Sequence, residues 1–420
     1  MSHLVLLALR SAWNRRLTLG LVVLTIALSV TMLLGVERLR HHAQEGFAQS
    51  VAGTDLIVGA RSSPVQLLLF SVFHVGEPTG SMRWDSAMHI AAHPAVAWTI
   101  PLSLGDSHRG YPVLGTNGDY FLHYRHGDAR ALEFSSGRPF TRLFEAVLGA
   151  EVAERLGYRA GDRISLSHGM QEGALTAHDD KPFTVAGVLK RTGTPVDRTV
   201  HVSLEAIEAI HLDWQGGARL PGMQIPSEFV RKFDLSPKQI SGMLVGLKSR
   251  AAVFRMQRHV IEYEGEALLA ILPGVALGQL WQVVGVVEQS LLLVSALVVL
   301  VGLCGLVAVV LAGLNERRRE LAILRSVGAQ PADIFLMLVI EGFALACAGC
   351  ALGLLLLSLG GAAIAPFAEA HFGLSLPLAL LSAQELPLLA AVLATAVLAS
   401  LVPGYRAYRL SLADGLTPRL

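Results

Sequence analysis

Residues 17–36 read LTLGLVVLTIALSVTMLLGV, a run of 20 positions without a charged side chain. At about 1.5 Å per residue, a helix of this length crosses the roughly 30 Å hydrocarbon core of a bilayer. A secretory signal peptide is the alternative interpretation. The run is long for such a segment, however, and no small-x-small cleavage site follows it before Glu37 and Arg38. We therefore predict a retained transmembrane helix.

Three further apolar runs follow at residues 289–314, 334–368 and 386–402, and Glu341 alone interrupts the second of them. Over the 420 residues, 52% are apolar and 16% are charged. Soluble domains are usually about a quarter charged, so this composition argues against a disordered, nucleic-acid-binding or ordinary cytosolic protein. The sequence predicts an α-helical membrane protein with four transmembrane helices and no nucleic-acid partner.

Basic side chains predict the orientation of these helices, since cytoplasmic loops carry an excess of Lys and Arg. The N-terminus, the 315–333 connection and the C-terminal tail are rich in arginine, whereas the short 369–385 connection contains neither Lys nor Arg. We therefore expect a multi-pass protein of the bacterial inner membrane with both termini in the cytoplasm. The predicted segments are a cytoplasmic N-terminus (1–16), transmembrane helix 1 (17–36), an extracytoplasmic segment (37–288), transmembrane helix 2 (289–314), a cytoplasmic loop (315–333), the transmembrane helix 3 region (334–368), a short outer loop (369–385), transmembrane helix 4 (386–402) and a cytoplasmic tail (403–420).

The 252-residue segment at 37–288 is long enough to form a folded domain. Short β-branched runs bounded by Gly and Asp alternate with helical patterns, which predicts a large mixed α/β extracytoplasmic domain. Within it we expect a helix over 144–156 and a buried strand in the apolar run from Pro64 to Gly76. Because nothing breaks the helical pattern from Val275 to Leu314, we also predict stalk helices that continue the membrane spans; the alternative is a surface helix anchored by Trp281.

The cytoplasmic connection carries the most specific pattern, NERRRELAILRSVGAQPADIF at residues 315–335. Asn315 is a good helix N-cap and Gly328 a good C-terminal stop. Between them the sequence predicts a short helix with an apolar side and a basic rim. The basic residues alone are enough to hold this loop in the cytoplasm, so they do not explain the apolar side of the helix. The apolar side therefore favours a docking surface for a cytoplasmic partner.

This loop, together with Ile334, Phe335 and Glu341, resembles the signature of ABC transporter permeases of the macrolide-exporter, lipoprotein-releasing and FtsX-like family. The closing PGYRAYRL at 403–410 is similar to that family's C-terminal motif, and the layout of one helix, a MacB-like periplasmic domain and three helices matches as well. The resemblance implies a permease homodimer or heterodimer that works with a cytoplasmic ABC ATPase. It also implies that the loop is the ATPase-coupling helix, formed by Glu316, Arg317, Arg318, Arg319, Glu320, Leu321, Ile323, Leu324, Arg325, Val327 and Gly328.

The resemblance further implies the export or extraction of a substrate from the outer leaflet or periplasm, coupled to movement of the outer domain. A lipoprotein, a lipid, a drug or a metal-related compound would serve as substrate, with a periplasmic adaptor or substrate protein and membrane lipid as further partners. The alternative is an FtsX-like signalling subunit that activates an extracytoplasmic partner without transport. None of the five lysines follows a glycine in a phosphate-binding loop, so we expect no enzymatic activity, no catalytic residues and no cofactor on this chain, with ATP and Mg²⁺ bound by a separate ATPase.

Two polar features add candidate sites. Glu341 lies in the third apolar run, where a lipid-exposed carboxylate costs a few kcal/mol, and we expect it either to couple to the basic loop or to anchor the helix bundle. Thirteen of the fifteen histidines lie in the outer segment. His89 and His93 share one helical face, and His123 and His126 are three positions apart, spacings that suit a transition metal although no third ligand completes them. Surface histidines without a metal are the competing interpretation.

Overall fold

The computed structural model describes residues 16–50, 52–76, 80–169, 178–215, 218–219, 225–316, 318–372, 381–383 and 385–409. The chain divides into two compact units. We call residues 1–42 and 285–420 the helical unit, and residues 43–284 the α/β unit.

The described part of the helical unit contains four helices that are long and apolar enough to cross a membrane. They are α2 (Arg16–Ser50), α9 (Pro273–Glu316), α11 (Pro331–Phe372) and α12 (Leu386–Arg409), and the short α10 (Arg318–Ser326) joins α9 to α11. Each predicted apolar run lies on one of these helices. The four-span architecture is therefore confirmed.

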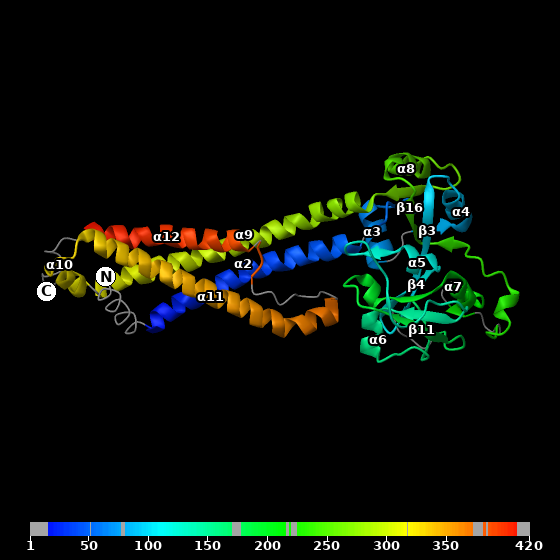
Figure 1. The fold of residues 1–420 in the computed structure, drawn as a ribbon, viewed down its shortest axis with the longest axis horizontal. Helices are drawn as coiled ribbons and strands as arrows, with labels where there is room; N and C mark the ends of the chain where they lie inside the picture. Colours follow the sequence, from blue (N-terminus) through cyan, green and yellow to red (C-terminus); the bar gives the residue numbers. More distant parts are fainter. Residues whose placement is uncertain are drawn as a thin grey trace. The chain divides into compact units, whose positions relative to one another are not determined.

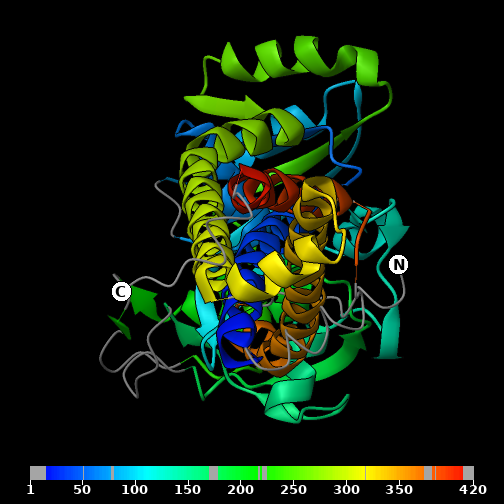
Figure 2. The same ribbon diagram turned by 90° about the vertical axis from the view of Figure 1, so that its left-hand side faces the viewer.

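Figure 2 looks along the long helices, and small residues allow these helices to pack closely. A Cβ atom added to Gly349 of α11 would lie 2.6 Å from the Ile26 side chain of α2, and one added to Gly353 would lie 2.8 Å from the Ala27 carbonyl oxygen. Two turns before Gly349 on α11, a Cβ on Gly342 would collide with the Ser400 side chain of α12. Close backbone approach through small residues is a general way to pack helices in lipid.

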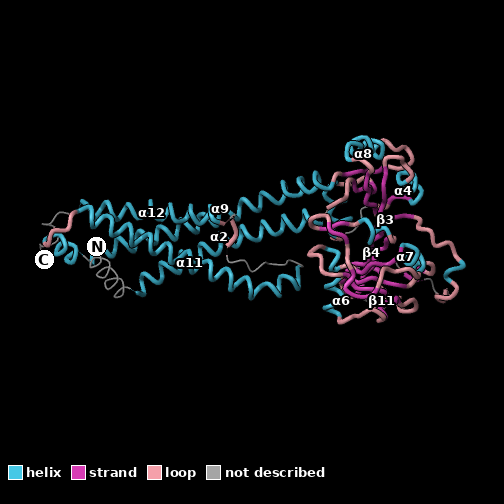
Figure 3. Tube along the Cα trace, viewed as in Figure 1, coloured by secondary structure: helices cyan, strands magenta, loops and turns pink. Residues whose placement is uncertain are grey.

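The α/β unit is built on an 11-stranded mixed sheet with the order β17-β1-β16-β3-β4-β12-β8-β11-β7, with β10 and β9 paired to β3 and β11 (Figures 1 and 3). Two neighbouring pairs, β4 with β12 and β8 with β11, are parallel, and the other pairs in the sheet are antiparallel. The strands of this sheet are β1 (Leu56–Ala60), β3 (Val96–His108), β4 (Tyr111–Thr116), β7 (Phe134–Gly137), β8 (Glu145–Leu148), β9 (Arg163–Ile164), β10 (Ser167–His168), β11 (Phe183–Leu189), β12 (Val200–Ser203), β16 (Gly242–Leu247) and β17 (Leu268–Ile271).

In the described residues of this unit, the strands are accompanied by the α-helices α3 (Pro64–Phe73), α4 (Trp84–Ala91), α5 (Asp119–His123), α6 (Ala150–Leu156), α7 (Leu204–His211) and α8 (Val253–Ile261). Short 3₁₀ turns cover Pro195–Arg198, Val230–Lys232 and Arg250–Ala252, and β2 (Met82–Arg83), β5 (Arg125–His126), β6 (Arg130–Ala131), β13 (Trp214–Gln215), β14 (Ala218–Arg219) and β15 (Gln239–Ile240) form small side ladders. The mixed α/β class predicted for the outer segment is confirmed.

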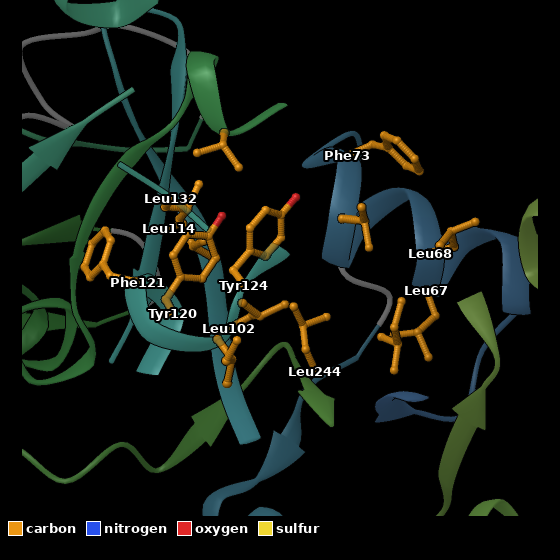
Figure 4. Close-up of a cluster of buried hydrophobic side chains, with 14 of the residues drawn as sticks. Leu67, Leu68, Phe73, Leu102, Leu114, Tyr120, Phe121, Tyr124, Leu132 and Leu244 are labelled. Carbon is orange, nitrogen blue, oxygen red and sulfur yellow. The ribbon is translucent and has the colours of Figure 1, made fainter. Parts of the chain in front are cut away.

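One of the cores of this unit is aromatic, and Figure 4 shows its central part. Tyr120 and Tyr124 stack with their ring centroids 5.0 Å apart, and Leu67 and Leu68 of α3 belong to the same buried cluster. The first turns of α9 also join it, because Leu277 is buried there and Trp281 packs against it. Trp281 is therefore part of a protein core, which argues against the membrane-surface alternative for this segment.

Hydrogen bonds hold the end of α2 in the α/β unit, and α9 leaves this unit as one continuous helix. The Tyr124 hydroxyl donates to the Ser50 carbonyl oxygen at 3.1 Å, and the Gly127 N–H donates to the Gln49 carbonyl oxygen at 3.0 Å, which fixes the end of α2. α9 runs from Pro273 to Glu316 without interruption. The predicted continuous helices are thus present in the described residues.

Two local predictions are wrong. The apolar run from Pro64 is helix α3, because Ser63 and Pro64 begin a helix and His74, in the left-handed region at φ 53°, ends it. The expected helix over 144–156 is divided into strand β8 and helix α6 at Gly149, where an added Cβ would collide with the Val196 carbonyl oxygen. Short apolar runs do not distinguish strand from buried helix by periodicity, which explains the first error.

Candidate functional site

Helix α10 presents two different faces to its surroundings. Leu321 and Ala322 are 7% and 5% exposed, and Leu321 belongs to the buried cluster of the helical unit, with Leu324 packed against that cluster. Ile323 and Val327, one helical turn apart, are 53% and 83% exposed. The apolar side predicted from the sequence is thus divided: two leucines seat the helix on the bundle, and Ile323 and Val327 remain available to a partner.

The basic half of this helix is described by its backbone alone. Arg318 begins α10, Glu316 ends α9, and Arg317 lies outside the described residues. The side chains of Glu316, Arg318, Arg319 and Glu320 also lie outside them. Arg325, in the last turn, is half-buried.

The C-terminus of α10 is closed by a Schellman motif. Ala329 N–H donates to the Leu324 carbonyl oxygen at 3.1 Å, and Gly328 N–H donates to the Arg325 carbonyl oxygen at 3.2 Å. Gly328 has φ 110°, a backbone conformation that side chains with a Cβ rarely adopt. A tight stop of this kind sets the position of α10 between α9 and α11.

Replacing Gly328 by alanine is expected to destabilise the end of α10 by about 1–2 kcal/mol, because a residue with a Cβ is strained at this positive φ. No atom of the described residues lies within 4 Å of the added Cβ, so a steric clash does not contribute. Hydrogen exchange of the amides of 321–330 should accelerate, since the Schellman bonds open more often. Gly305→Ala, inside α9 with open space around it, is the matched control and should leave exchange in α10 unchanged. Equal protection in wild type and Gly328→Ala would contradict the assigned role of the left-handed stop.

Glu341 lies close to the same helix. It is half-buried on α11 and lines a cavity of about 60 Å³ together with Leu321 of α10, Thr18 of α2 and Gly313 of α9. A cavity of this size has room for water molecules, which can solvate a carboxylate within a bundle. Glu341 and the buried face of α10 therefore lie at the same cavity. Leu321 and Glu341 are 20 positions apart in the sequence, which by itself does not predict that they are close.

An ion pair that the sequence did not reveal links α2 to the start of α12. Arg38 donates from Nε to Glu385 Oε1 at 2.7 Å and from Nη2 to Oε2 at 2.9 Å, and the two side chains are 11% and 2% exposed. Ser382 N–H also donates to Glu385 Oε2 at 3.1 Å. Burial by itself would raise the pKa of Glu385, but the bonds from Arg38 and Ser382 outweigh it and lower that pKa.

The four predicted metal-ligand histidines occupy two separate places. His89 on α4 and His93 just beyond its end approach His259 of α8, with ring centroids 6.2 Å and 4.7 Å from that of His259. His123 at the end of α5 stacks on Trp98 at 5.4 Å between centroids, and His126 is buried on β5. In the described part of the chain, one group of at least three His, Cys, Asp or Glu side chains has ligand atoms within 4.8 Å of one another, and it is formed by Asp106, His168 and His211 instead.

Two family models match the chain. The model described as an FtsX-like permease C-terminal domain matches residues 292–412, and the model described as a MacB-like periplasmic core domain matches residues 17–260. Among curated proteins, the chain is 33% identical over 117 residues to the macrolide export ATP-binding/permease protein MacB of Brucella abortus (strain 2308) and to that of Brucella melitensis biotype 1. The aligned stretch covers 28% of this chain and 17% of those relatives, so the chain matches only a small part of their length.

Two solved structures resemble the chain over about half its length. The extracellular domain of the noncanonic ABC-type transporter YknZ from Gram-positive bacteria is 14% identical, with 52% of this chain and 98% of that one covered at a TM-score of 0.29. The periplasmic region of MacB from Actinobacillus actinomycetemcomitans is 11% identical, with 56% and 97% covered at a TM-score of 0.33.

Proposed function

Because this chain belongs to the family of ABC transporter permeases that carry a MacB-like periplasmic core domain and an FtsX-like permease domain, we propose that it couples ATP hydrolysis by a cytoplasmic ABC ATPase to movement of its α/β unit. The movement serves to export or extract a substrate from the outer leaflet or periplasm. In this proposal both termini and α10 face the cytoplasm of a bacterial inner membrane, and the permease works as a dimer.

The observation that carries the proposal is the geometry of α10. This helix is seated on the bundle through Leu321 and Leu324, stopped at Gly328, and exposes Ile323 and Val327. An exposed apolar pair beside arginines suits the groove of a protein partner, since interface cores favour apolar anchors with charged residues at the rim. We therefore propose that Glu316 to Gly328 rest on the ATPase, supplied by a separate chain.

A path from the ATPase to the α/β unit is provided by the long helices. α9 begins in the core of the α/β unit, where Leu277 is buried, and ends at Glu316, directly before α10. A continuous helix is stiff along its axis, so a displacement of α10 is transmitted through α9. This supports coupling through the helices rather than passage of substrate between them.

Substitution of Glu341 tests whether this residue couples ATP hydrolysis to transport. Replacing it by alanine should leave ATPase binding intact, because the exposed face of α10 is unchanged, but reduce transport by about tenfold or more, as expected for the loss of a charged hydrogen-bonding group worth about 1.5–3 kcal/mol. The measurement is co-purification with the ATPase alongside transport in proteoliposomes. Glu341→Gln, which keeps the shape of the side chain, shows whether the charge or the hydrogen bonds matter. Normal transport by Glu341→Ala would refute a coupling role.

Stimulation of the ATPase by substrate tests the proposed function itself. Permease and ATPase reconstituted together should hydrolyse ATP faster when lipoprotein, lipid or amphiphilic drug is added. The FtsX-like alternative predicts no such stimulation, and predicts instead that the α/β unit captures an extracytoplasmic enzyme and activates it when ATP is hydrolysed. The large α/β unit, with several buried cores, favours the transport function.

A further inference from the structure

Three side chains from distant parts of the sequence converge at one place in the α/β unit. Asp106 lies on β3, His168 on β10 and His211 at the end of α7. Asp106 Oδ1 lies 3.1 Å from His168 Nδ1 and 3.4 Å from His211 Nε2, and the two histidine nitrogens lie 3.2 Å apart. The three atoms thus form a nearly equilateral triangle.

These edges match the requirements of a zinc ion. Tetrahedral ligand atoms at about 2.0–2.1 Å from Zn²⁺ lie about 3.3–3.4 Å from one another. Without an ion, one N–H at His168 Nδ1 is shared between Asp106 Oδ1 and His211 Nε2, and a shared bond is less well aligned with each acceptor than a separate bond would be. A single cation above the triangle would satisfy all three atoms. We infer that Asp106, His168 and His211 form a binding site for a divalent transition-metal ion of the Zn²⁺ type.

The local structure prepares each ligand for this role. His168 and Asp106 are directly paired residues of antiparallel strands, which places their side chains on one face of the sheet. The register of β3 on β4 shifts between Leu104 and Asp106, so Gly105 forms a bulge, a feature that re-aims neighbouring side chains. The carboxylate of Asp106 is therefore directed by the strand itself.

His211 has the hydrogen bond typical of a metal-binding histidine. Its Nδ1 lies 2.8 Å from the Ile207 carbonyl oxygen, which can only accept, so Nδ1 carries the proton and Nε2 is the atom left for a ligand. A backbone carbonyl in this position fixes the ring orientation and tautomer in many metal sites. Nε2 is the atom that faces Asp106.

His178 provides a second, independent indication. Its side chain is fully buried, and neither ring nitrogen has a hydrogen-bond partner among the described residues. Its ring lies 5.1 Å from that of His211 and 4.3 Å from that of Trp214 between centroids. A buried imidazole beside His211, with no hydrogen-bond partner in the described part of the chain, is the type of nitrogen ligand that transition-metal ions prefer.

Charge and access are also favourable. Asp106 is 3% exposed at its side chain, whereas His168 and His211 are 39% and 26% exposed, so an ion can enter from the solvent. The buried cation beside His178, Lys181, is paired with Asp213 at 2.6 Å. The site therefore combines one carboxylate with imidazole nitrogens, which are donor types found in zinc sites.

Metal binding by the full-length chain in detergent tests the inference. The protein, without a histidine tag, is stripped with a chelator, incubated with Zn²⁺ alone, and its metal content and affinity are measured by mass spectrometry and chelator competition. About one tightly bound Zn²⁺ per chain is expected, and His168→Ala and His211→Ala should each weaken binding by about tenfold or more. Co²⁺ should give the absorption spectrum of a low-symmetry, tetrahedral-type site in the wild-type protein.

The double variant His89→Ala/His93→Ala is the matched control, because it removes two histidines of the other cluster. It should retain the tight site. Circular dichroism confirms that each variant is folded, and Asp106→Asn adds a nearly isosteric variant that removes only the charge. No retained Zn²⁺ in the wild-type protein, unchanged affinity in the triad variants, or loss of binding in the control alone would each overturn the assignment.

Discussion

Replacing both Ile323 and Val327 of α10 by glutamine is expected to weaken binding of the ATPase by about a hundredfold or more. The two side chains are the exposed apolar anchors of the helix, and truncation of a central interface anchor typically costs about 2 kcal/mol or more. Glutamine is a good helix former and keeps a comparable length, so α10 should remain folded. Co-purification and titration of the ATPase against permease in nanodiscs measure the effect.

The matched control for this variant is Phe254→Gln on α8, an apolar side chain that is 71% exposed in the α/β unit. It removes a similar exposed apolar group and should leave ATPase affinity unchanged. Leu321→Ala differs in kind, since Leu321 is buried: it should destabilise the bundle by about 2–5 kcal/mol rather than weaken docking selectively. Full ATPase affinity in the Ile323→Gln/Val327→Gln variant would refute α10 as the docking element.

Ile323 is exposed whereas Leu321 is buried, and the sequence predicts only part of this arrangement. A helix over the loop, its stop at Gly328 and its apolar character follow from residue types, because capping and periodicity are local. Which of the apolar residues face the bundle depends on the positions of α9 and α11, which no local pattern contains. The same holds for Glu341, whose cavity is lined from four helices.

Sites formed by residues that are distant in the sequence are harder to predict from the sequence. Asp106, His168 and His211 are brought together by strand pairing and by the end of a helix, so no ligand spacing signals them. The spacing of His89 and His93 does look like a metal site in the sequence, and the structure places both rings near that of His259. The one available signal was Gly105 before Asp106 within a strand pattern, since a glycine there indicates a bulge.

Arg38 and Glu385 illustrate the same limit and carry the largest expected effect on stability. Replacing Arg38 by methionine leaves the Glu385 carboxylate buried without its bidentate partner, which typically costs about 3–5 kcal/mol. The thermal midpoint in detergent should fall by roughly ten degrees. Arg38→Lys should recover only part of the loss, because an ammonium cannot make both parallel bonds.

Removing both charges separates the cost of an unpaired carboxylate from the value of the pair. The Arg38→Met/Glu385→Gln variant has no charged side chain at either of these two positions. Its free energy of unfolding should return to within about 1–2 kcal/mol of the wild-type value. The pH dependence gives an independent check. Because the folded pKa of Glu385 is lowered, the pair stabilises the protein above the ordinary glutamate pKa of about 4.3, and this contribution disappears as the pH falls through the folded pKa. The double variant should lack that acid-dependent loss; if it loses stability over the same pH range as wild type, another carboxylate is responsible and the assigned role of Glu385 is wrong.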